Sequence, residues 1–178
     1  HGSQKICVFD QFPLPIFEEK LSSVNNSKNS NNLIPKQYFV SQGSGGELTH
    51  FVHSSTYHAV DFDVDVGTDV YSMCDGVVKE INCDNDGGGI DANCIFTANY
   101  LTIECTSAQH QHLHIDYVHL MNSSVKVSVG ERVAAGQVIA KSGAVGFCPR
   151  PHLHIQVNDS FEVNSPSLKI GWVGAQFG

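Results

Sequence analysis

The stretch CPRPHLHIQV, residues 148–157, places two histidines two positions apart in an alternation of polar and apolar residues. In a β-strand, residues two apart point to the same face. His152, His154 and Gln156 would therefore share one face, and the three aliphatic residues among them the other. Pro151 and the glycine-containing segment before it favour a bend that exposes the start of the strand. The stretch predicts a strand with one face in a core and two imidazoles facing a cleft.

The rest of the chain has the same character from Gln37 onward. Short β-rich runs alternate there with glycine-containing turns, and helical periodicity is scarce. We therefore expect a mostly β fold over residues 37–178, a compact antiparallel β domain. Residues 1–36 contain FPLPIFEEKLSS and then the polar VNNSKNSNN, which favour an N-terminal arm followed by a flexible connector. The runs are QYFV, HAVDFDVDV, GVVKEI, YLTIEC, HLHIDYVHL, SVKVSV, QVIAKS and HLHIQV.

Composition excludes some partners. The 178 residues are 41% hydrophobic, which is enough for one packed core. The net charge of −8 and the sequence pI near 5.6 argue against nucleic acid and against an anionic membrane surface. No apolar run approaches the length of a membrane span. We expect a monomer with no nucleic-acid and no membrane partner.

The six cysteines favour an exported protein. They include no C-x-x-C pair, so a structural zinc knuckle is not indicated, and their wide spacing fits disulfides formed in an oxidising compartment. Cys83 and Cys94 bracket the polar loop DNDGGGIDAN and are the pair that we predict. Asp84 and Asp86 in this loop resemble the start of a calcium loop, but Ile95 stands where that loop needs Glu. The first residues have the look of a processed terminus, and we expect secretion, extracellular or periplasmic.

An acid and further histidines precede the H-x-H pair. In HAVDFDVDV, Asp61 lies on one strand face with two further aspartates, for which a solvated face is the simpler interpretation. Upstream lie His50, His53 and His58. One of these imidazoles, a carboxylate and a histidine of the later pair would make three protein ligands of a catalytic zinc set, with the fourth position left to water.

Taken in order, these segments resemble the lysostaphin-type zinc metallopeptidases, the LytM-like peptidoglycan endopeptidases. The resemblance covers about residues 38–157 and rests on VSQGSGGELTHFVHSSTYHAVDFDVDVGTDVYSMCDGVV, DYVHLM and VKVSVGERVAAGQVIAKSGAVGFCPRPHLHIQV. The last block is the densest match and is far more specific than a lone H-x-H. The resemblance implies a compact antiparallel β domain with zinc bound in an open groove.

The resemblance also implies the roles of individual residues. It places two zinc ligands on Asp61 and His154 and the two catalytic imidazoles on His119 and His152. In the family these imidazoles activate water and stabilise the tetrahedral intermediate.

The first zinc ligand departs from the commonest family pattern. Many members have this histidine four residues before the aspartate, where this chain has Tyr57. Others have Ser-His or Thr-His after a glycine-rich segment, and GELTH matches that form, so we expect His50 to be the ligand. His53 and His58 are the alternatives.

A second HLHI occurs at residues 112–115. Strand alternation puts His110, His112 and His114 on one face, for which a partly solvated histidine face is the simplest interpretation. The same alternation puts His119 on the opposite face, with Ile115 and Tyr117.

The resemblance implies a secreted zinc endopeptidase that hydrolyses peptide bonds in the cross-bridges or stem peptides of bacterial peptidoglycan. The alternative is a non-catalytic zinc-binding signalling or binding protein on the same fold, like the leukocyte-derived chemotaxin of vertebrates. Members that have lost activity tend to lack a catalytic histidine. Because both His119 and His152 are present, we favour the enzyme.

Overall fold

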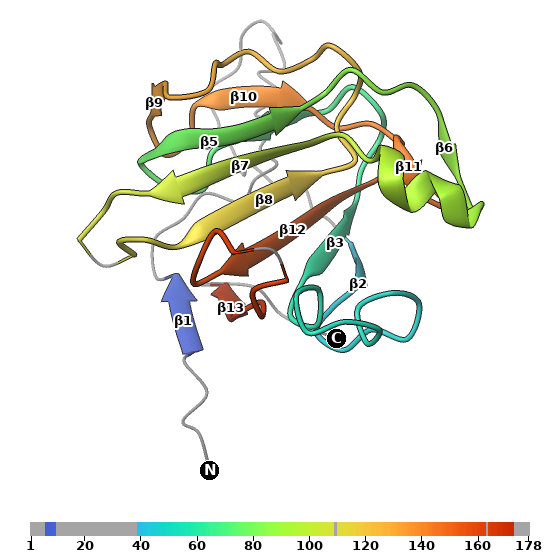
Figure 1. Ribbon diagram of the computed structural model, residues 1–178, viewed down its shortest axis with the longest axis horizontal. Coiled ribbons are helices and arrows are strands. Elements are labelled where there is room, and N and C mark those ends of the chain that lie inside the picture. The colour runs from blue at the N-terminus through green and yellow to red at the C-terminus, as the bar shows by residue number, and fades with distance from the viewer. Residues whose placement is uncertain (1–5, 10–38, 109, 163, 173–178) are drawn as a thin grey trace, which may run out of the picture.

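The computed structural model of the chain describes residues 6–9, 39–108, 110–162 and 164–172. Its centre is a seven-stranded sheet in which every neighbouring pair is antiparallel, in the order β2-β3-β12-β8-β7-β5-β9 (Figure 1). The prediction of a mostly β, antiparallel fold is confirmed. The strands of this sheet are β2 (Val40–Gln42), β3 (Val60–Asp63), β5 (Gly76–Asn82), β7 (Tyr100–Cys105), β8 (His114–Val118), β9 (Arg132–Val133) and β12 (His152–Asn158).

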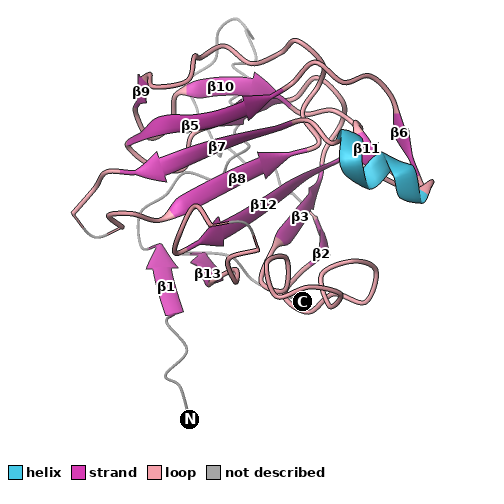
Figure 2. Cartoon of the chain, viewed as in Figure 1, coloured by secondary structure: helices cyan, strands magenta, loops and turns pink. Residues whose placement is uncertain are grey.

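Three strand pairs and a short 3-10 helix complete the described fold (Figure 2). The run SVKVSV, predicted as β-rich, contains no strand and forms a loop that precedes β9. Of the predicted N-terminal arm and connector, only β1 lies within the described residues, and it pairs in parallel with β13. These elements are β4 (Asp69–Tyr71) with β10 (Val138–Lys141), β6 (Gly88–Gly89) with β11 (Gly146–Phe147), β1 (Ile6–Phe9) with β13 (Lys169–Trp172), and the helix η1 (Ala92–Thr97).

The two faces of the large sheet differ in polarity, as the alternation in β12 predicts. Aliphatic and aromatic side chains of β5, β7, β8 and β12 fill one face and form the core. Polar side chains of the same strands line the opposite face, which is open. The buried set includes Val78, Leu101, Ile103, Ile115, Tyr117, Leu153, Ile155 and Val157. The fold thus leaves one polar sheet face available for chemistry.

The predicted disulfide between Cys83 and Cys94 is wrong. Both are free thiols, and the bond instead joins Cys74 to Cys105. Antiparallel pairing of β5 with β7 sets Gly76 opposite Cys105, which brings Cys74 beside the end of β7. The polar loop that suggested the wrong pair holds β6 and η1 instead.

Within the described part of the chain, no helix is both long enough and apolar enough to cross a membrane.

Candidate metal centre

Three side-chain donor atoms meet at one edge of the open sheet face. His50 Nε2 lies 3.2 Å from Asp61 Oδ1, and His154 Nδ1 lies 2.8 Å from the same oxygen. The two ring nitrogens are 3.4 Å apart. Ligands about 2.0–2.1 Å from a tetrahedral zinc ion are separated from one another by roughly 3.3 Å. The spacing of these three atoms therefore fits a single zinc ion.

The outer nitrogens of both rings support the same conclusion. His50 Nδ1 lies 2.9 Å from the carbonyl oxygen of Gly43, and His154 Nε2 lies 3.1 Å from Gln156 Oε1. Both partners are acceptors, so in a neutral ring the outer nitrogen carries the proton and the inner nitrogen presents a lone pair. Two lone pairs and a carboxylate then face one point, which is the donor set of a bound cation. Such outer partners are typical of zinc-ligating histidines.

Electrostatics in this cluster favour a charged carboxylate. Burial opposes ionisation of Asp61, but in the metal-free protein the contacts with the His154 and His50 rings outweigh it and hold the pKa of Asp61 well below its usual range. Burial likewise opposes protonation of His154, but the neighbouring Asp61 carboxylate raises the pKa of that ring. The site therefore attracts positive charge, which a metal ion supplies.

Strand pairing explains why these residues meet. His154 and Asp61 are direct partners in the β12–β3 ladder. His50 lies in the irregular segment between β2 and β3, and it is fully buried. The two alternatives for the first ligand lie elsewhere: His53 contacts Ser55, and the ring of His58 contacts a serine hydroxyl outside the cluster.

Two further imidazoles flank the three donors. The ring centroids of His119 and His152 are 4.5 Å apart, and His119 is 6.1 Å from His154 by the same measure. His119 Nδ1 donates to the carbonyl of Val145 at 2.8 Å, and His152 Nδ1 donates to that of Arg150 at 2.9 Å. In the neutral tautomer that these contacts favour, each ring presents the lone pair of Nε2. For His152 this atom lies 3.7 Å from Asp61 Oδ2.

His119 reaches this face through an unusual backbone conformation. Its φ is +64°, in the left-handed region that non-glycine residues rarely adopt. β8 ends one residue earlier, so the regular alternation that would put His119 with Tyr117 in the core stops at Val118. Burial and the neighbouring His152 and His154 lower the pKa of His119 to about 3, which keeps the ring neutral.

Two hollows of the surface lie near these residues. One, of about 480 Å³, is lined by Gln42, Asp61, Arg150 and His152 among others. The other, of about 350 Å³, lies over β7, β8 and β12 and is bordered by the loop that follows β12. Asp61 thus lines the first hollow, and Gln156, which contacts His154, lines the second.

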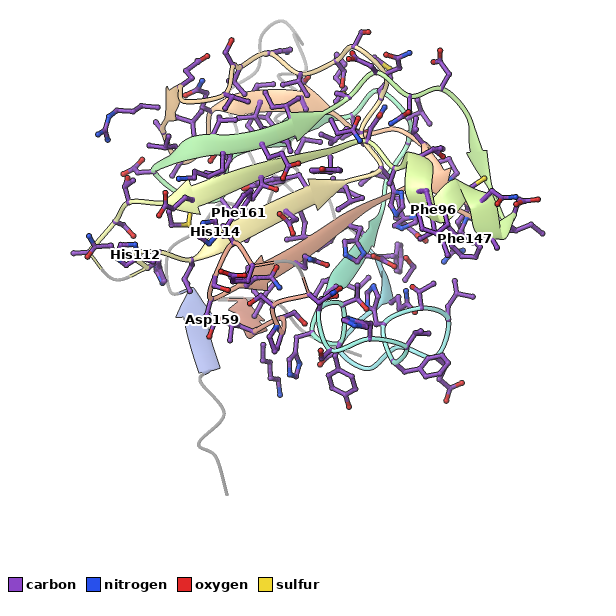
Figure 3. All side chains as sticks on the ribbon, viewed as in Figure 1. Phe96, His112, His114, Phe147, Asp159 and Phe161 are labelled. Carbon is purple, nitrogen blue, oxygen red and sulfur yellow. A yellow bond between two sulfur atoms is a disulfide. The ribbon has the colours of Figure 1, made fainter. Side chains whose placement is uncertain are left out.

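The histidines of the HLHI at residues 112–115 do not form the partly solvated strand face that we predicted. β8 begins only at His114, and His112 precedes it in a turn with φ of +72°. His114 is 7% exposed and packs on Phe161, with ring centroids 5.4 Å apart. Figure 3 shows these two rings together, with His112 farther out. His114 therefore borders the second hollow rather than solvent.

Two glutamines contact the metal donors and were not predicted as site residues. Gln42 Nε2 donates to Asp61 Oδ2 at 2.7 Å. Gln156 contacts His154 and donates to Asp116 at 2.9 Å. Strand alternation had placed Gln156 on the same face as His152 and His154, and this could have predicted Gln156 as a site residue. No sequence signal marked Gln42, because its position depends on the pairing of β2 with β3.

The arrangement is typical of a metallopeptidase: a histidine, aspartate and histidine donor set with two further imidazoles beside it on an open face. Comparison with known proteins identifies the group. The family described as Peptidase family M23 matches residues 55–166, and the chain belongs to that family. Peptidases of this family depend on zinc, in agreement with the donor set.

Relatives with assigned names are bacterial. The chain is 34% identical over 130 residues to the glycyl-glycine endopeptidase ALE-1 of Staphylococcus capitis, covering 70% of this chain and 32% of that protein. It is 32% identical over 102 residues to the peptidoglycan DD-endopeptidase ShyA of Vibrio cholerae, covering 57% of this chain and 20% of that protein. The chain thus spans about a third or less of the length of these relatives.

Solved structures agree with the fold. Lysostaphin from Staphylococcus simulans superposes with a TM-score of 0.55 at 29% identity, over 74% of this chain and 47% of that one. The separate catalytic domain of lysostaphin gives a TM-score of 0.52 at 27% identity and is covered over 85% of its length. The similarity therefore lies in the catalytic domain.

Proposed function

We propose that the chain is a zinc endopeptidase that cleaves peptide bonds in bacterial peptidoglycan. The observation that carries the proposal is the meeting of His50, Asp61 and His154 beside His119 and His152 on one sheet face. In this proposal the first three residues hold zinc and the other two are catalytic. The proposal also takes residues 37–178 as the peptidase domain and residues 1–36 as an N-terminal arm and connector.

The protein's own groups divide the catalytic work. Zinc, when bound, acidifies a water molecule and polarises the scissile carbonyl. The backbone carbonyls that accept from Nδ1 of His119 and His152 favour the neutral tautomer in which Nε2 of each ring carries the lone pair. One Nε2 accepts the proton of the attacking water, and a protonated ring then donates to the developing oxyanion or to the leaving amine. The pKa of His119, lowered to about 3 chiefly by burial, keeps this ring unprotonated at neutral pH, so its Nε2 is free to accept a hydrogen bond.

The substrate class is supported by the open site and by the relatives. In this proposal an extended peptide lies along the hollow that Asp61 and His152 line. Two of the named relatives are a glycyl-glycine endopeptidase and a peptidoglycan DD-endopeptidase. A protein acting on this polymer works outside the cytoplasm, secreted or periplasmic, where the disulfide between Cys74 and Cys105 is stable. We propose that it acts there as a monomer.

The proposal is tested by measuring zinc content and peptidoglycan cleavage in parallel. Zinc is measured by mass spectrometry, and cleavage by the release of amines from purified peptidoglycan. We expect His154→Ala to lose both zinc and cleavage. We expect His119→Ala to keep zinc and to lose about 10²–10⁴-fold in rate, the usual contribution of a positioned acid or base.

His53→Ala is the matched control, because His53 lies near the site in sequence but contacts Ser55 instead of the donors. It should keep both zinc and activity. A wild-type protein without zinc, or a fully active His119→Ala variant, would contradict the mechanism. Zinc binding without cleavage of any peptidoglycan would refute the proposed substrate.

A further inference from the structure

The segment that carries His50 has little regular structure to hold it in place. His50 and Asp61 are eleven positions apart, and the residues between His50 and β3 form turns and bends. Two donors on a shared strand ladder, such as Asp61 and His154, are fixed by the ladder itself. His50 has no ladder partner, although its Nε2 must stay within about 0.5 Å of its place to bind the same ion.

Gln42 joins this segment to the strand that carries Asp61. It is the ladder partner of Asp61 across β2 and β3, and its side chain is buried, with 8% exposed. Its Oε1 accepts from the backbone N–H groups of Leu48 at 3.0 Å and Thr49 at 2.8 Å, just before His50. Its Nε2 donates to Asp61 Oδ2 at 2.7 Å. One amide group therefore contacts both the segment of the first donor and the carboxylate of the second.

The amide also selects which carboxylate oxygen faces the other donors. Asp61 Oδ2 accepts from Gln42, so Oδ1 is the oxygen left toward His50 and His154. Gly46 packs directly against this side chain, since a Cβ added at Gly46 would overlap Gln42 Cγ. Thr49 Oγ1 also accepts from Nε2, at 2.9 Å.

We propose that Gln42 is a positioning residue for the metal centre. It fixes the His50 segment and the orientation of the Asp61 carboxylate before the ion binds. This inference rests on the proposed zinc site, and it adds a residue that acts only through the ligands. Outer contacts of this kind are worth about 10–100-fold in metal affinity.

The test is zinc affinity, measured on metal-free protein by competition with a chromophoric chelator. Gln42→Met keeps the length of the side chain but removes both its donor and its acceptor. We expect zinc to bind about 10–100-fold more weakly in this variant. Gln137→Met is the matched control, because Gln137 Oε1 also accepts from a backbone N–H, that of Ala134, but far from the metal donors in the sheet. This control should bind zinc like wild type.

Two further variants separate positioning from general stability. Thr49→Val removes only the minor acceptor of Gln42 and should leave zinc affinity within about threefold of wild type. Gly46→Ala leaves the amide intact but displaces it, so it should weaken zinc binding as Gln42→Met does. Folding of each variant is checked by circular dichroism of the metal-free protein. If Gln42→Met fails to fold, Gly46→Ala tests the positioning role of Gln42 instead, because it removes no hydrogen-bonding group.

The outcomes are distinct. If folded Gln42→Met binds zinc within threefold of wild type, Gln42 has no positioning role, although the zinc site itself is unaffected. Where Gln42→Met does not fold, the same result for Gly46→Ala leads to the same conclusion. If wild type itself binds no zinc, the proposed function fails, and this inference fails with it.

Discussion

Removal of the bond between Cys74 and Cys105 should destabilise the protein by a predictable amount. The two cysteines are 31 positions apart, and both are buried in the core. Cross-linking restricts the unfolded chain, and for a loop of this length the closure entropy corresponds to about 4 kcal/mol at 25 °C. In a chain of this size each kcal/mol shifts Tm by about 2–4 °C, so we expect a fall of roughly 7–15 °C.

The measurement is thermal and urea unfolding of the Cys74→Ala/Cys105→Ala variant beside wild type. Cys83→Ala/Cys94→Ala is the matched control, since it also removes two thiols but breaks no bond. The control should lose about 1 kcal/mol, mostly from the buried Cys83. A first variant that melts within about 2 °C of wild type, or a control that loses as much as the first variant, would show that the cysteine pairing is wrong.

Three other changes test the core and the site. Met73 N–H donates to the buried Tyr117 hydroxyl at 2.8 Å. Tyr117→Phe removes this acceptor and should lower the free energy of unfolding, measured in urea, by about 1–3 kcal/mol. Gly143→Ala brings a Cβ to 2.8 Å from the carbonyl oxygen of His119, so kcat should fall while zinc content, by mass spectrometry, stays unchanged. The pKa of His119 is lowered to about 3 in the folded protein, from about 6.5 in the unfolded chain. Between these two pH values the unfolded chain binds a proton that the folded chain does not, so acid favours unfolding. Metal-free wild type should therefore lose about 2 kcal/mol more than His119→Gln between pH 7 and 4.5, measured by urea unfolding; equal losses would contradict this.

Much of the fold could be predicted from strand alternation. The polar and apolar positions of residues 152–158 define the two faces of β12, and the structure has the aliphatic set in the core. The order of motifs in the chain predicted the family, which the match over residues 55–166 confirms. Alternation also indicated that Gln156 shares the face of His154.

Contacts that depend on register could not be predicted in the same way. Cys105 meets Cys74 because β5 and β7 pair with Gly76 opposite Cys105, and sequence spacing alone favoured the loop pair instead. The burial of His114 depends on Phe161, from a loop after β12 whose path no local pattern predicts. Cysteine spacing and histidine composition are local signals, whereas these contacts are long-range.

His119 shows why alternation alone would misplace a residue that we propose to be catalytic. Continued as a strand, β8 would turn this ring into the core beside Tyr117, where an imidazole would need a buried partner. The left-handed φ of +64° ends the alternation and turns the ring toward His152. Such a conformation costs about 1–3 kcal/mol unless its surroundings hold it. Here the carbonyl of Val145 accepts from Nδ1, and Gly143 packs against the backbone of residues 119–121 with no room for a Cβ. Gly143, the glycine of the Ser-Gly in the last motif, therefore helps to hold the backbone of His119 in this conformation, although it carries no reactive group.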